Sequence, residues 1–153
     1  MANEAVLSLG TPLTLESSGT SGAVNDGSVV ECDSAPRAST DDTGYPLGIF
    51  EFDAGSGGWS VAPSTGAAIH LYEQKINSNG NDAPDVVATD YEHDYLYTFN
   101  VDDADVQQHL TSPPLPINRS GGKYWLKWVD GGAGSAQLSA GWELRLTPVT
   151  YGT

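Results

Sequence analysis

Apolar side chains recur at every second position in three stretches of this chain, at 95–101, 124–128 and 142–146. An alternation with a period of two places one row of side chains on the core face of a strand and the next row on the opposite face. Each stretch is therefore predicted to be a β-strand with one face in a core. The rows consist of Tyr95, Tyr97, Phe99, Val101, Tyr124, Leu126, Trp128, Trp142, Leu144 and Leu146.

Further short strands are predicted where small groups of apolar residues stand between turn-forming residues. They cover 5–9, 13–15, 28–32, 48–53, 59–61, 67–76 and 86–87, with an exposed loop at 77–85. One short helix is predicted at 102–110, because acids at its start favour the helix dipole and two prolines stop it. The whole pattern predicts an all-β fold, an antiparallel β-sandwich that is jelly-roll-like and has at most one short helix.

The first third of the chain differs in composition from the rest. Residues 16–27 and 33–44 are mostly small and polar, and the strand signals strengthen from Pro46 onward. We therefore divide the chain into an extended, low-complexity N-terminal arm with short strands at 1–45 and a β-sandwich domain at 46–153. A chain of 153 residues can bury a sizeable core without disulfides.

Charge narrows the classes of partner. Lys and Arg number 6 against 20 Asp and Glu, which gives a formal net charge of −14. A nucleic-acid partner or an anionic membrane surface requires clustered basic residues, so we expect neither. A strongly acidic surface is typical of a soluble protein that resists aggregation, and it also suits bound cations or a basic partner. The chain opens without a basic segment and an apolar core, so no signal peptide is expected.

Recognisable catalytic or cofactor motifs are absent from the sequence, so we expect neither enzymatic activity nor a cofactor. Cys32 is the only cysteine and is predicted to be a small buried apolar residue. Carboxylates gather in three places where a hard cation such as Ca²⁺ could find oxygen ligands, and whether they bind one stays open. These clusters are Asp82 with Asp85, then Asp90, Glu92 and Asp94, then Asp102, Asp103 and Asp105.

Trp125 lies on the strand face opposite to the row of Tyr124, Leu126 and Trp128. Three interpretations follow from this position: a strand buried on both faces, an anchor for a protein partner, or a platform on which a sugar stacks.

The segments 122–132 (GKYWLKWVDGG) and 138–148 (LSAGWELRLTP) resemble small virion proteins of tailed bacteriophages, the capsid decoration or cement proteins. The opening, with TPLTL at 11–15, is similar to the N-terminal arms of such proteins. The resemblance implies a β-sandwich without enzymatic activity that is made in the host cytoplasm. It would bind the major capsid protein on the outer surface of the phage head, often as a homotrimer, and stabilise the shell.

With this function, the arm is predicted to contact neighbouring subunits, and two tryptophans are predicted anchors. The candidate interface residues are Ala5, Val6, Leu7, Leu9, Leu13, Leu15, Trp59 and Trp125. Two alternatives remain open. The first is another virion component, such as a head fibre base or a tail-associated protein. The second is a carbohydrate-binding β-sandwich module, for which Trp125 would be the stacking residue.

Overall fold

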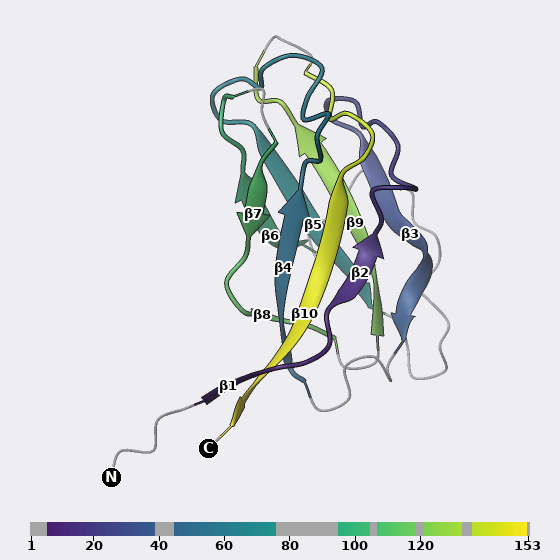
Figure 1. The fold of residues 1–153 in the computed structure, drawn as a ribbon, viewed down its shortest axis with the longest axis vertical. Coiled ribbons are helices and arrows are strands. Elements are labelled where there is room, and N and C mark those ends of the chain that lie inside the picture. The colour runs from purple at the N-terminus through teal and green to yellow at the C-terminus, as the bar shows by residue number, and fades with distance from the viewer. Residues whose placement is uncertain are drawn as a thin grey trace.

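The computed structural model describes residues 6–38, 45–75, 95–104, 107–118, 121–132 and 136–152, and leaves the side chains of Val6, residues 33–38, Lys75 and Gly152 undescribed. Two antiparallel sheets pack face to face (Figure 1). The larger sheet has the order β1-β10-β4-β7, with β2 also paired to β10 and β8 to β4; the smaller has the order β3-β9-β5-β6. The predicted all-β sandwich is thus confirmed, whereas its jelly-roll connectivity stays a prediction.

The strand bounds lie close to those predicted from the alternation. The larger sheet consists of β1 (Val6–Leu9), β2 (Leu13–Glu16), β4 (Leu47–Asp53), β7 (His109–Thr111), β8 (Leu115–Pro116) and β10 (Glu143–Gly152). The smaller sheet consists of β3 (Val29–Ala38), β5 (Ala68–Lys75), β6 (Tyr95–Asn100) and β9 (Gly121–Val129). The strand expected at 59–61 is reduced to a single bridge between Trp59 and Leu138. The loop at 77–85 and the strand at 86–87 lie outside the described residues.

The core lies between the two sheets and is rich in aromatic rings. Trp128 of β9 and Trp142, immediately before β10, are almost fully buried. Phe52 of β4 stacks beside Trp142 with ring centroids 6.1 Å apart, and Phe50 of β4 packs against Tyr124 of β9 at 5.4 Å. Each indole N–H is satisfied, because Trp128 donates to the Ala136 carbonyl at 2.7 Å and Trp142 to the Gly22 carbonyl at 2.8 Å. The rows at 124–128 and 142–146 therefore face the core, as the alternation predicted.

The helix predicted at 102–110 is wrong, because the described part of that segment contains none. His109–Thr111 forms β7 against β4, and the turn before it is held by the side chain of Gln108. Gln108 accepts from the Asp102 N–H at 2.9 Å and donates to the carbonyls of Asp102 and Ala104. This one buried amide satisfies three backbone groups of the turn, the Asp102 N–H and the carbonyls of Asp102 and Ala104.

Two strands within the predicted arm of 1–45 pair with strands of the sandwich. β2 pairs with β10 and β3 pairs with β9, so both strands belong to the sandwich itself. Of the strands expected in the arm, β1 alone lies beyond the body of the sandwich (Figure 1).

A β-bulge in β6 changes the face on which one predicted core residue lies. Leu71 pairs with Tyr97 and Tyr72 pairs with Tyr95, so Leu96 is an extra residue between two pairs. Leu96 and Tyr97 both pack against the core, whereas Tyr95 is half exposed on the outer face. The assignment of Tyr95 to the core row is therefore wrong, because the inserted residue reverses the alternation at this point.

Candidate interaction surfaces

The most prominent surface feature is a two-stranded ribbon that projects from one end of the sandwich. The pairing of β4 with β10 ends at Val149, whereas β1 continues along β10 from Val149 to Gly152. Beyond Val149, β10 is therefore paired with β1 alone among the described strands. Figure 1 shows this ribbon at the lower left, where β1 runs beside the last part of β10.

The ribbon exposes apolar side chains that the sandwich does not cover. Leu7, Leu9 and Tyr151 are 43%, 60% and 57% exposed, and they are three of the five large apolar residues exposed in the described part of the chain. Leu7 and Tyr151 are direct cross-strand partners, so their side chains share one face. A two-stranded ribbon is marginally stable by itself, and an apolar face on it favours contact with another surface.

The candidate interface residues divide into surface and core positions. Leu7 and Leu9 lie exposed on the ribbon, Leu13 packs partly against the core, and the side chains of Ala5 and Val6 are outside the described part. Leu15 and Trp59 need a correction, because they are 7% and 2% exposed and belong to the core of the protomer. Trp59 packs beside Trp128 with ring centroids 5.7 Å apart, so it has no face left for a partner.

Trp125 is half buried on the outer face of the smaller sheet, as the sequence placed it. Its indole N–H donates to Oε1 of Gln74 at 3.3 Å, and its cross-strand partner on β5 is Tyr72. Tyr72 in turn pairs with Tyr95 on β6. Three aromatic residues therefore form one row across β9, β5 and β6.

A shallow groove of about 360 Å³ lies beside this row and is open to solvent. Its walls are the side chains of His70, Tyr72, Tyr95, Thr98 and Lys127. The Tyr95 ring stands edge-on to Tyr72 at 6.2 Å and lies 6.4 Å from the His70 ring. Neither tyrosine was a candidate from the sequence, although the unbroken run Tyr95-Leu96-Tyr97 does signal a break in the alternation.

The polar groups of the groove are linked through Thr98. Its hydroxyl lies 2.8 Å from Nδ1 of His70 and 2.8 Å from the Tyr95 hydroxyl, so it bridges the two rings. Partial burial of the imidazole, and secondarily the charge of Lys127, lower the pKa of His70 below 6.5. The groove therefore presents a neutral imidazole at pH 7 with the Lys127 ammonium beside it.

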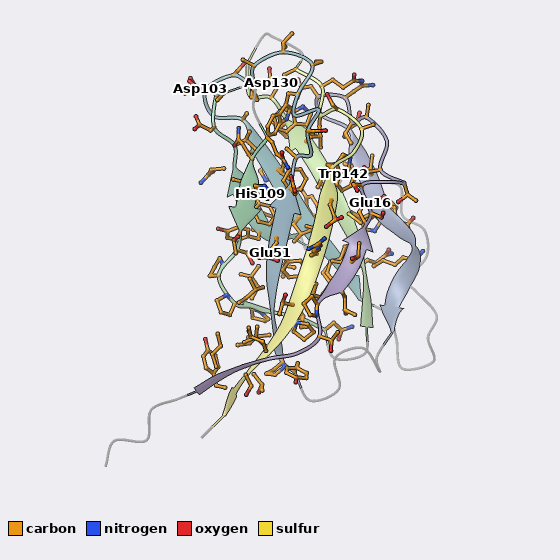
Figure 2. All side chains as sticks on the ribbon, viewed as in Figure 1. Glu16, Glu51, Asp103, His109, Asp130 and Trp142 are labelled. Carbon is orange, nitrogen blue, oxygen red and sulfur yellow. The ribbon has the colours of Figure 1, made fainter. Side chains whose placement is uncertain are left out.

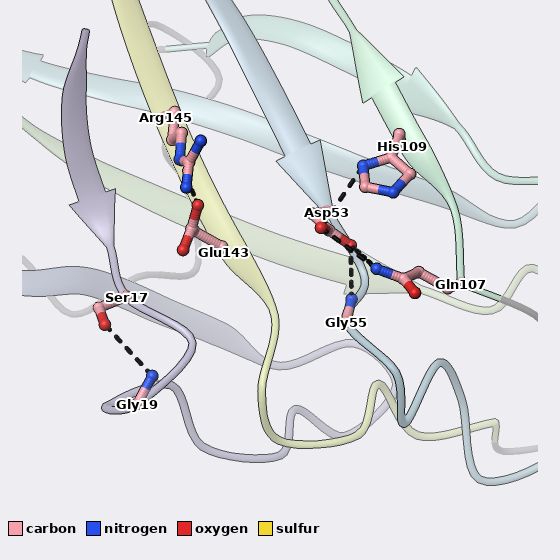
Figure 3. Close-up of polar contacts among 8 residues, drawn as sticks. All are labelled: Ser17, Gly19, Asp53, Gly55, Gln107, His109, Glu143 and Arg145. Carbon is pink, nitrogen blue, oxygen red and sulfur yellow. Dashed lines mark hydrogen bonds and ion pairs between the residues drawn. The ribbon is translucent and has the colours of Figure 1, made fainter.

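A second cleft, of about 210 Å³, lies on the outer face of the larger sheet between β7, β4 and β10. Figure 3 shows the polar contacts of Asp53 and the ion pair between Arg145 and Glu143 in this cleft. Asp53 accepts from the Gly55 N–H at 2.8 Å and from Gln107 at 3.0 Å, and it lies 3.4 Å from Nδ1 of His109. Arg145 forms an ion pair with Glu143 on the same strand. Glu51 and His109 mark this face in Figure 2.

The described residues include no group of three or more His, Cys, Asp or Glu side chains arranged to hold a metal ion. Asp102 and Asp103 are exposed, and Asp105 lies outside the described part. So do the clusters of Asp82 with Asp85 and of Asp90, Glu92 and Asp94. Within the ranges described, no helix is long and apolar enough to cross a membrane.

The comparisons with known proteins returned no relative. No protein-family model, no curated protein and no solved structure matches this chain.

Proposed function

We propose that the protein is a non-enzymatic virion structural protein of the capsid-decoration or cement class. It binds the major capsid protein on the outer surface of a phage head, associates with copies of itself as a homotrimer, and stabilises the shell. The observation that carries this proposal is the projecting β1–β10 ribbon with exposed Leu7, Leu9 and Tyr151. The resemblance of 122–132 and 138–148 to phage decoration proteins names the class.

The ribbon has the properties needed for strand addition to a neighbouring protein. The outer edge of β1 pairs with no described strand, so its backbone N–H and C=O groups can extend the sheet of a partner. Main-chain hydrogen bonds would give affinity, and Leu7 with Leu9 would fill apolar pockets on alternate positions. A stable contact buries about 800 Å² per partner, so the ribbon would have to lie along the capsid surface.

Charge is consistent with this mode of action. A net charge of −14 keeps the free protein soluble, even though each copy carries an exposed apolar ribbon. Binding then requires a partner surface that covers the apolar side chains, as the repeated subunits of a capsid shell would. The same ribbon would suit a head fibre base or a tail protein, which would differ in copy number per particle.

The test is the mass of the protein in solution by light scattering, alone and after mixing with shells assembled from the partner major capsid protein. We expect an oligomer that joins the shell in many copies. A chain truncated to begin at Gly10 should keep its fold, because β10 retains β4 and β2, and should lose shell binding by at least about tenfold.

A triple variant that combines Leu7→Asp, Leu9→Asp and Tyr151→Asp should lose shell binding as the truncated chain does. Its matched control is Val61→Asp, which changes an apolar residue that is 53% exposed and lies off the ribbon. A protein that stays monomeric and ignores the shell overturns the proposal. So does a ribbon variant that binds the shell as well as the unaltered chain does.

A further inference from the structure

We propose that the groove on the outer face of β6, β5 and β9 binds a pyranose unit of a glycan in the corner formed by the edge-on rings of Tyr95 and Tyr72, with Lys127 as a hydrogen-bond donor to the sugar. This binding site is separate from the ribbon and does not depend on the function proposed for the ribbon.

The first argument is the aromatic row itself. Tyr95, Tyr72 and Trp125 occupy matched positions on three adjacent strands, so their backbone positions lie along a line across the sheet, and the Tyr95 ring stands edge-on to that of Tyr72. With strands spaced about 4.8 Å apart, the row is roughly 10 Å long, which suits a disaccharide. The C–H face of a pyranose ring carries slight positive charge and packs on the negative face of an aromatic ring.

The second argument is the bulge at Leu96. Without this extra residue, Tyr95 would share the core face with Tyr97 and Phe99, as the sequence alternation implies. The bulge moves the Tyr95 side chain to the outer face, where it is half exposed. Bulges are common where a strand re-aims a side chain at a functional site.

The third argument is the mixture of polar groups around the rings. His70, Thr98 and the Tyr95 hydroxyl form a linked set that can donate and accept hydrogen bonds, which matches the hydroxyl groups on the rim of a sugar. Lys127 adds three donors, and it makes no ion pair with any carboxylate in the described part of the chain. Lys123, four residues away on the same face of β9, is already paired with Glu31 at 3.2 Å.

The lining favours a glycan over a protein partner. The five side chains around the groove include no aliphatic residue, and lysine is depleted in the cores of protein interfaces. The surface is also hollowed, with a volume inside the usual range for ligand pockets of about 300–1,000 Å³. The acidity of the chain disfavours nucleic acids as an alternative stacking ligand.

The experiment uses the full chain on an array of neutral and uronate-bearing oligosaccharides, followed by titration calorimetry with the best-bound member of each class. We expect Tyr95→Ala and Tyr72→Ala each to weaken binding by about fivefold to tenfold. Lys127→Gln separates the two classes, because it should weaken a uronate-bearing glycan more than a neutral one. Tyr151→Ala is the matched control, since Tyr151 is an exposed tyrosine on the ribbon.

Two outcomes overturn the inference. One is an array on which the unaltered chain binds no glycan above the level of Tyr95→Ala. The other is glycan binding that Tyr95→Ala and Tyr72→Ala leave unchanged, or that Tyr151→Ala weakens equally. Thermal unfolding of each variant confirms that it is folded. Shell binding by Tyr95→Ala should equal that of the unaltered chain, which separates failure of this site from failure of the ribbon.

Discussion

The outer faces of the two sheets cover the same core but differ in the side chains that line their clefts. On the larger sheet, Asp53, Glu143 and Arg145 are charged groups with partners on their own face. On the smaller sheet, Tyr95 and Lys127 border a groove that is open to solvent, and the Tyr95 side chain is half exposed there. The difference indicates that the first face mainly stabilises the protomer, whereas the second is suited to contact with a ligand.

The largest expected effects test whether the inner faces of the two sheets are equivalent. Leu126 on β9 and Leu146 on β10 are both fully buried, so replacing either with alanine removes apolar contacts and leaves a cavity. We expect each change to lower the free energy of unfolding by about 2–5 kcal/mol. Urea unfolding followed by tryptophan fluorescence measures the loss.

The outer neighbours of these leucines provide matched controls. Lys127 follows Leu126 on β9, and Arg145 precedes Leu146 on β10. Lys127→Ala and Arg145→Ala should each lower the free energy of unfolding by less than about 1 kcal/mol. A large loss for Lys127→Ala, comparable to that for Leu126→Ala, would contradict the description of the smaller sheet as buried on its inner face alone.

The core rows were predictable because burial repeats with the period of the strand. Trp128, Trp142 and Leu144 lie inside the sandwich, as the period of two requires. The helix at 102–110 was mispredicted because the sequence shows acids and prolines but does not show that Gln108 closes the turn. The pairing of β2 with β10 and of β3 with β9 was not predictable, because the small polar residues at 16–27 and 33–44 carry no signal for strand pairing.

The candidate surfaces were less predictable than the core. Leu7 and Leu9 were recognised as apolar residues in a short strand. Their exposure was not predictable, because it arises where β1 and β10 continue past the end of β4, a strand distant in sequence. Trp125 was placed on the correct face by alternation alone. Tyr95 was not, since a single inserted residue reverses the faces of a strand and leaves composition unchanged.

An intermediate effect is expected from the polar contacts of each outer face. Asp53→Ala removes the acceptor for the Gly55 N–H and for Gln107, and we expect a loss of about 1–2 kcal/mol in unfolding free energy with glycan binding unchanged. Thr98→Val removes the hydroxyl that joins His70 to Tyr95, so it should weaken glycan binding. Calorimetry measures glycan binding by both variants, and thermal unfolding measures their stability. Impaired glycan binding by Asp53→Ala, with Thr98→Val unaffected, would contradict the comparison of the two faces.

The smallest expected effect is a pH dependence that belongs to the smaller sheet. The pKa of His70 is lowered from 6.5 by partial burial and then by Lys127, whose charge faces it from β9, while Thr98 and Tyr95 contact it from β6. Because the unfolded chain takes up this proton more readily, the stability contributed by neutral His70 is complete above pH 6.5 and falls as the pH drops towards the folded pKa. His70→Gln should remove this dependence of the unfolding free energy on pH.

In an NMR titration of the His70 imidazole, Lys127→Ala should raise the midpoint without returning it to 6.5, since burial is the larger cause of the lowered pKa. A midpoint that Lys127→Ala leaves unchanged would show that the Lys127 charge does not act on the groove, and would weaken its assigned role there.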